Sequence, residues 1–397
     1  MRALRSARLG ADFTRLWAAS AVSNLGDGIT LAAGPLLVAS LTGEPLLVAG
    51  AAFAQQLPWL LVAPLSGVYV DRLDRRRLII VVNVLRGLAV AGLAVAIAAS
   101  AVSIPLIYAV FFLLGVGETL ADTAFGALIP ATVAADRLTI ANSRLATTTV
   151  LGNQILSKPL GGWLFASAAA LPFAVDAITF LAGAALIAAM RVRPPRGTAT
   201  GRVREDVRAG LRWLWRHRLL RTLAVTMGVA NVAFCAAFAV FALLARERLG
   251  LAAAGYGFLL AAFGVGGLVG GFLSARVQRA VPARVLLRGG LVVEVVTHAV
   301  LAATTEPLLA GAVLAVFGAH GVNWGIIVAT LLQRSVPDGL RGRVGSVYSL
   351  VQVGGAAAGS LLGGLVGQVA GVTATFWAAS AAMAAITVVS WRPLAAA

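Results

Sequence analysis

Long apolar runs separated by short polar gaps make up most of this sequence. A helix needs about 20 mostly apolar residues to cross the hydrocarbon core of a bilayer. Twelve runs reach or approach that length, so we expect an all-α integral membrane protein with twelve transmembrane helices. The expected spans are residues 14–41, 46–70, 78–100, 104–128, 143–166, 171–190, 222–244, 254–274, 285–303, 307–332, 344–368 and 372–391.

The longest polar stretch, residues 191–221, falls between the sixth and seventh runs. It predicts an N-terminal six-helix half over 1–190, a cytoplasmic linker over 191–221 and a C-terminal six-helix half over 222–397. From about Arg204 the linker has a helical pattern that places Val207, Leu211, Leu214 and Trp215 on one face. This pattern is typical of an amphipathic helix at a membrane surface, and a solvated charged loop is the alternative.

The arginines predict the orientation of the spans. Loops that stay in the cytoplasm carry the excess of lysine and arginine. With both termini in the cytoplasm, only Arg246 and Arg248 fall on the opposite side of the membrane. We therefore expect both termini to be cytoplasmic.

Composition excludes several classes of protein. Only 12% of residues are charged and 60% are hydrophobic, whereas about a quarter of a soluble domain is charged. The net charge of +17 lies in the gaps between apolar runs, so we expect a lipid bilayer and no nucleic acid as a partner. No phosphate-binding loop, serine elbow or metal-ligand spacing is present, which indicates no enzyme activity, no cofactor and no metal site. Cys235 is the only cysteine, so no disulfide can form within the chain.

The gap between the second and third runs carries a fixed arrangement of one glycine, one aspartate and four arginines: Gly67, Asp71, Arg72, Arg75, Arg76 and Arg77. A plain basic loop is the alternative interpretation. The arrangement resembles the cytoplasmic loop signature of the major facilitator superfamily, with Asp74 where a second glycine is usual. The resemblance implies two six-helix repeats that rock about a central substrate site, and a cytoplasmic gate formed by these six residues.

The two halves show signs of duplication. At an offset of 204 residues, Gly67 matches Gly271, Arg72 matches Arg276, and Asp27 matches Asn231. Repeated halves around a site near the bilayer midplane are typical of secondary transporters.

Polar residues inside the apolar runs are the candidates for function, because burying an ionisable group in a membrane is costly. The resemblance implies that the first, fourth, seventh and tenth spans line the cavity, and the fifth adds the only lysine. The candidates for proton coupling and for the cavity are Asp27, Glu118, Asp122, Lys158, Asn231, His320 and Asn323.

Pairing among these residues is also predicted. We expect Lys158 to pair with Asp27, Glu118 or Asp122, either to hold helices together or to let one carboxylate exchange a proton. Asp27 and Asp122 could instead cap helices near span ends. Glu294 and His298, four residues apart, are expected to satisfy each other, and we expect Asp176 to be an interfacial or packing residue.

Further stretches resemble the bacterial branch of the superfamily that includes the enterobactin exporter and related multidrug exporters. They are residues 13–28, 115–122, 205–221 and 337–343. The resemblance implies a multi-pass protein of the bacterial plasma membrane, a monomer, that exports a drug-like or siderophore-like small molecule against protons. Ser157 and the displaced Pro159 depart from the antiporter signature of the fifth span, while Gly161 and Gly162 match it. A proton-coupled uptake symporter and a receptor or scaffold that does not transport are the alternatives.

Overall fold

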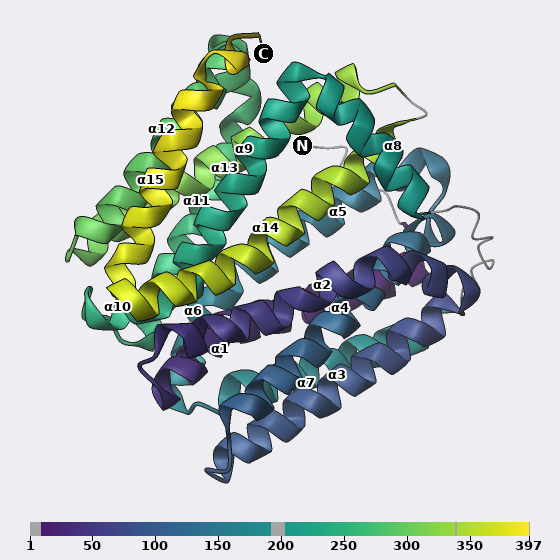
Figure 1. Cartoon of the computed structure of the whole chain (residues 1–397). Helices are drawn as coiled ribbons and strands as arrows, with labels where there is room; N and C mark the ends of the chain where they lie inside the picture. Colours follow the sequence, from purple (N-terminus) through teal and green to yellow (C-terminus); the bar gives the residue numbers. More distant parts are fainter. Residues whose placement is uncertain (1–8, 192–202, 338–339, 397) are drawn as a thin grey trace. The chain divides into compact units, whose positions relative to one another are not determined.

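A computed structural model describes residues 9–191, 203–337 and 340–396, apart from the side chains of residues 63–72, 135, 203–207 and 396. In this part of the chain the protein is helical and contains no strand (Figure 1). The helices are α1 (Ala11–Leu41), α2 (Pro45–Arg72), α3 (Arg75–Ala98), α4 (Ile104–Thr132), α5 (Leu138–Thr149), α6 (Ser157–Ser167), α7 (Leu171–Ala188), α8 (Val203–Arg216), α9 (Arg218–Ala239), α10 (Phe241–Glu247), α11 (Ala253–Ala280), α12 (Ala283–Ala303), α13 (Pro307–Ser335), α14 (Arg341–Ala370) and α15 (Val372–Trp391). Two 3-10 turns, η2 (Ala135–Arg137) and η5 (Pro393–Ala396), and a π-helical segment, η3 (Val150–Leu156), complete the described elements.

Contacts between helices divide the chain into two compact units. The N-terminal unit comprises the described parts of residues 1–33 and 61–200, and the C-terminal unit those of residues 34–60 and 201–397. The end of α1 and the first half of α2 therefore belong to the C-terminal unit. The expected boundaries of the two six-helix halves, after residues 190 and 221, stay a prediction.

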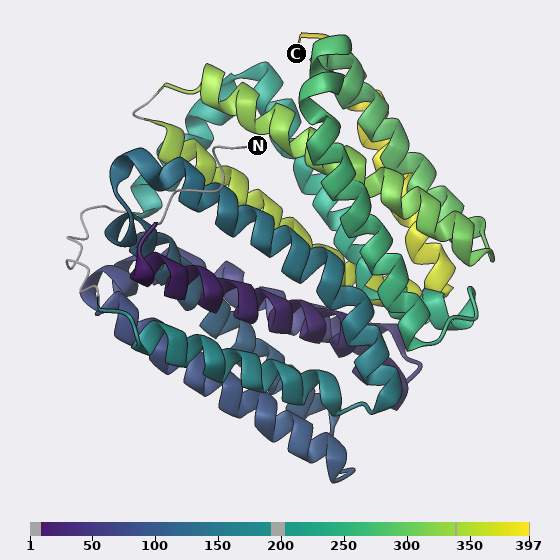
Figure 2. The same ribbon diagram turned by 180° about the vertical axis from the view of Figure 1, so that it is seen from behind.

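In the N-terminal unit, α3 packs between α4 and α7, and the three helices lie side by side in both views (Figures 1 and 2). The apolar side chains at their contacts include Ile79, Leu128 and Ile187, all nearly inaccessible to solvent. In the C-terminal unit α9 packs on α14, α11 on α13, and α12 on α15.

Small residues let helices of the C-terminal unit approach closely. A side chain at Gly266 or Gly270 of α11 would overlap the main chain of α13 at Ala315 or Ala319. Helix contacts in membranes depend on such close packing, because lipid provides no hydrophobic force that drives apolar helices together.

Eleven of the described helices are long and apolar enough to cross a membrane. The predicted fifth span, residues 143–166, falls instead on α5, η3 and α6, which follow one another without a gap from Leu138 to Ser167. The π-helical segment divides this stretch, so none of its pieces alone has the length of a span. The total of twelve spans and the cytoplasmic location of the termini stay predictions.

The linker helix forms where the sequence predicted it. In α8, Leu214 is buried, whereas Leu211 and Trp215 on the predicted apolar face are exposed. Gly210 lies against the main chain of α14 at Arg343. The location of α8 at a membrane surface stays a prediction.

Candidate functional site

A buried ion pair joins α1 to α3 inside the N-terminal unit. The Arg86 guanidinium donates from Nη2 to Asp27 Oδ1 at 2.7 Å, and the Ser23 hydroxyl donates to Asp27 Oδ2 at 3.3 Å. The Arg86 side chain is only 5% exposed, and its Cζ lies 4.1 Å from the centroid of the Phe180 ring on α7. Arg86 Nε is buried and has no hydrogen-bond partner. The pair is therefore held by three helices, with one donor of the arginine unused.

Asp27 and Arg86 line a polar cavity of about 110 Å³, which we call the N-terminal cavity. Its other polar lining residues are Ser20, Ser23, Asn24, Asn83, Glu118, Asp122 and Asn153. The structure thus brings three predicted candidates, Asp27, Glu118 and Asp122, to one cavity. Pockets for drug-sized ligands measure about 300–1,000 Å³, so this cavity has room for water and a few polar groups only.

A second buried carboxylate lies at the contact between α1 and α7. Asp176 of α7 is fully buried, and its carboxylate accepts a hydrogen bond from Thr30 at 2.6 Å and contacts the Thr179 hydroxyl at 3.1 Å. A side chain at Gly26 would overlap both Asp176 and Thr179, so the absence of a Cβ there lets the two helices meet. The prediction that Asp176 is an interfacial or packing residue missed its hydrogen bond to α1.

The predicted ion pair of Lys158 is wrong for the residues that the structure describes. Lys158 Nζ donates to the carbonyl oxygen of Gly28 at 3.4 Å, while the ion pair of Asp27 is made with Arg86. The cause is the packing of α1 against the fifth predicted span, since Gly28 lies directly on Ser157 and on the main chain of Asn153. The lysine is thereby directed to the main chain of α1.

The candidates from the second half lie in the C-terminal unit, apart from the N-terminal cavity. Asn231 donates to Met227 O at 3.1 Å within α9. Asn323 joins α13 to α11, because its Nδ2 donates to Gly270 O at 3.1 Å and to Ala319 O at 2.9 Å. The amide of Asn231 therefore bonds within its own helix, and that of Asn323 holds two helices together.

The predicted mutual pair of Glu294 and His298 is also corrected. His298 Nδ1 is 2.7 Å from the main-chain oxygen of Glu294, and the Glu294 carboxylate lies instead 3.4 Å from Nε2 of His320 on α13. A spacing of four residues places two side chains on one face of a helix, but here the face of the adjacent helix provides the nearer partner.

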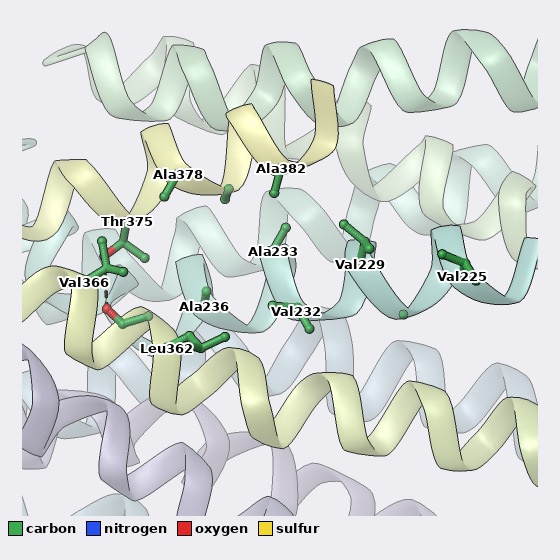
Figure 3. Close-up of a pocket in the computed structure, with 13 residues that line it drawn as sticks. Val225, Val229, Val232, Ala233, Ala236, Leu362, Val366, Thr375, Ala378 and Ala382 are labelled. Carbon is green, nitrogen blue, oxygen red and sulfur yellow. Dashed lines mark hydrogen bonds between the residues drawn. The ribbon is translucent and has the colours of Figure 1, made fainter. Parts of the chain in front are cut away.

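The C-terminal unit also contains an apolar cavity of about 450 Å³ between α9, α14 and α15. Figure 3 shows valines and alanines of α9 directed toward Leu362 and Val366 of α14 and toward α15. Its one hydroxyl, on Thr375, already donates to Gly363 O at 3.0 Å. This cavity has no ionisable lining residue, so it offers no group that could exchange a proton.

A model of the transmembrane secretion effector family matches residues 8–394 of this chain. The chain belongs to that family of major facilitator transporters. The multidrug efflux pump Tap of Mycolicibacterium fortuitum is 28% identical over 386 residues, which cover 94% of this chain and 93% of Tap. The enterobactin exporter EntS of Escherichia coli O1:K1 is 26% identical over 303 residues, 76% of this chain and 72% of EntS.

Solved structures of other transporters have the same fold as this chain. A bacterial homologue of the iron transporter ferroportin, in an inward-facing state, matches with a TM-score of 0.76 and 16% identity, over 96% of this chain and 98% of the other. A bacterial homologue of the human lysosomal transporter Spinster matches with a TM-score of 0.75 and 12% identity, over 98% of each chain. These structures show the major facilitator fold, and the family and the bacterial relatives show a multi-pass transporter of the plasma membrane.

The structure describes the side chains of part of the predicted gate motif. Asp74 begins α3 as its N-cap and accepts a hydrogen bond from the Arg77 main chain at 3.1 Å, which explains an aspartate at the usual glycine position. Arg76 donates from Nε to Ile187 O at 3.0 Å and from Nη2 to Ala188 O, at the end of α7. Gly67, Asp71 and Arg72 fall within α2, and their side chains lie outside the described residues.

Arg86 is a residue of this cavity that the sequence-based predictions do not include. They assign the loop motif to Arg72 and Arg75 to Arg77 and give Arg86 no role. Arg86 nevertheless stands ten residues beyond Arg76, roughly 15 Å further along the helix, inside an apolar run. The sequence alone therefore shows that Arg86 lies deep within a span, where a charge needs a partner.

Proposed function

We propose that this protein is a secondary exporter that moves a drug-like or siderophore-like small molecule out of the cell in exchange for protons, by alternating access. Two full-length relatives, Tap and EntS, are named as exporters, and the similarity to Tap extends over nearly the whole chain. The observation that carries the proton coupling is the Asp27–Arg86 ion pair in a cavity that Asp122 also lines.

In the proposed cycle Asp27 receives the proton. Protonation removes the negative charge that holds Arg86, and the guanidinium turns to the carboxylate of Asp122 across the same cavity. The buried arginine keeps a counter-ion in both states, which avoids the cost of an unpaired charge in the membrane. Release of the proton returns Arg86 to Asp27 and resets the N-terminal unit.

The gate residues complete the proposal. Asp71, Arg72, Arg75, Arg76 and Arg77 close the cytoplasmic side when the substrate site is open to the outside. The bonds from Arg76 to the end of α7 support this assignment, since they connect the motif to a helix that also carries Phe180 and Asp176. The protein acts as a monomer, and its partners are the substrate, protons and the lipid bilayer.

Reconstituted liposomes that contain a pH-sensitive dye test the function and its direction. When a fluorescent lipophilic cation enters from outside, an exchanger makes the lumen more alkaline, and a symporter makes it more acidic. Absence of both substrate flux and proton flux would support a receptor or scaffold. Asp27→Asn should abolish the proton signal, whereas Asp136→Asn is the matched control, because the Asp136 side chain is 78% exposed in the loop after α4.

A further inference from the structure

The C-terminal unit contains a second buried acid and base in contact. We propose that Glu294 of α12 and His320 of α13 form a proton-binding pair, separate from the N-terminal cavity. Nε2 of His320 lies 3.4 Å from Oε1 of Glu294, and the two side chains are 8% and 11% exposed. The proposal goes beyond export itself, since the pair binds a proton whether or not a given compound is transported.

The imidazole of His320 packs against a glycine and two aromatic rings. A side chain at Gly290 of α12 would overlap the ring of His320, so only glycine allows this approach. The ring stacks on Phe317 with centroids 6.5 Å apart and lies nearly perpendicular to the Trp324 ring, with centroids 5.8 Å apart. These contacts with Gly290, Phe317 and Trp324 fix the orientation of the ring, in which Nε2 faces the Glu294 carboxylate.

The second histidine on α12 does not share this proton. The main-chain oxygen of Glu294 can only accept, so the contact of 2.7 Å places a proton on Nδ1 of His298. His298 also lies edge-on to Phe317, at 5.7 Å. Among the described residues no three His, Cys, Asp or Glu side chains converge to hold a metal ion, so this cluster is suited to a proton.

Charge balance explains why one proton is held. With the Glu294 carboxylate ionised and His320 as an imidazolium, the pair has no net charge, and loss of the proton leaves a buried carboxylate with a neutral partner. An isolated charge in apolar surroundings is costly, so the neutral state is favoured. The other ionisable residues on the helices around the pair are Arg284, Arg288 and His298 on α12, Tyr256, Arg276 and Arg279 on α11, and Arg334 on α13; the span α15 carries no charged residue. The guanidinium of Arg288 is bound to the main-chain oxygen of Trp391. Arg276 is six residues beyond Gly270, the α11 residue that Asn323 contacts, so His298 is the nearest of these groups to the pair.

The chain has three histidines, which makes the proposal directly measurable. Nitrogen-15 NMR of histidine-labelled protein in lipid nanodiscs at pH 7 should show an imidazolium at His320 in the wild type and a neutral ring in Glu294→Gln. His217→Gln and His298→Gln assign the signals, and both should leave the imidazolium in place. Asp27→Asn should also leave it unchanged, and this separates the pair from the proposed transport site.

A neutral His320 ring in the wild type, or the same ring signal in the wild type and Glu294→Gln, would overturn the proposal. Tryptophan fluorescence gives a second measurement that leaves Glu294 in place, in case Glu294→Gln does not fold. An imidazolium against the Trp324 ring quenches its emission. Because His217 stacks on Trp213, the measurement is made in His217→Gln, where alkaline pH should raise the fluorescence. That rise should be lost when His320→Gln or Trp324→Phe is added, and a rise that persists in either double variant contradicts the assignment.

Discussion

Asp27 on α1 and Arg86 on α3 meet at 2.7 Å although 59 positions separate them in the chain. The arginine is almost completely buried, and the face of its guanidinium is covered by Phe180. A charge at this depth is tolerated only with a counter-ion, so in the proposed cycle the pair couples the position of α3 to the protonation of Asp27 on α1. The relation between these two residues is the basis of the proposed proton exchange.

Asp27→Asn should reduce proton-driven export to background, because the amide cannot release or accept the coupling proton. Protein in the membrane should stay detectable. The measurement is accumulation of a fluorescent lipophilic cation in cells, with and without a protonophore. Efflux by Asp27→Asn that equals that of the control Asp136→Asn would refute the role of Asp27.

Removal of one partner of the ion pair should destabilise the N-terminal unit. Breaking a buried pair costs about 3–5 kcal/mol when the other charge is left unpaired. Arg86→Gln leaves Asp27 without its counter-ion and should lower the midpoint of thermal unfolding in detergent. Asp27→Asn should lower it less, because Arg86 can turn to Asp122, and the double variant should be less destabilised than the sum of the two. Additive effects would mean that the two side chains do not interact.

Thr30→Val should cost about 1–3 kcal/mol of unfolding free energy, because it removes a donor from the fully buried Asp176 carboxylate. Thr139→Val, at an exposed position of α5, is the control and should change stability little. Chemical unfolding in detergent measures both. Equal stability of the two variants would show that the Thr30 hydroxyl is not needed by Asp176.

Gly290→Ala should displace the ring of His320, since the added methyl occupies its place. Overpacking of this kind costs about 1–3 kcal/mol. Gly289→Ala is a close control, because nothing lies within 4 Å of the Cβ that it adds. Thermal unfolding and the His320 imidazolium signal should change in Gly290→Ala and stay as in the wild type in Gly289→Ala.

Arg76→Gln should lower stability by about 1.5–3 kcal/mol, because a charged donor to the end of α7 is lost. Arg77→Gln removes the adjacent arginine, whose side chain is 87% exposed, and should have an effect below about 0.5 kcal/mol. If the gate assignment holds, Arg76→Gln also slows export more than Arg77→Gln does. Transport rates in liposomes, with protein amounts matched, decide this.

The sequence predicted the class of fold because the bilayer imposes a length on each helix. Runs of about 20 apolar residues can be counted without any knowledge of tertiary contacts, and the loop motif from Gly67 to Arg77 identified the superfamily. The collection of Asp27, Glu118 and Asp122 into one cavity was also predicted in part, since the family places the first and fourth spans at the centre.

Only the tertiary structure decided which buried charges meet. Lys158 had acids on other spans as predicted partners, and His298 had Glu294 by spacing, yet Asp27 binds Arg86 and Glu294 faces His320. Spacing along a helix determines the face on which a side chain lies, and the rotation and approach of the next helix determine what lies opposite. In this protein glycines at positions 26, 28 and 290 set those approaches, because side chains of adjacent helices lie where a Cβ would be, and no pattern of polar and apolar residues reveals this.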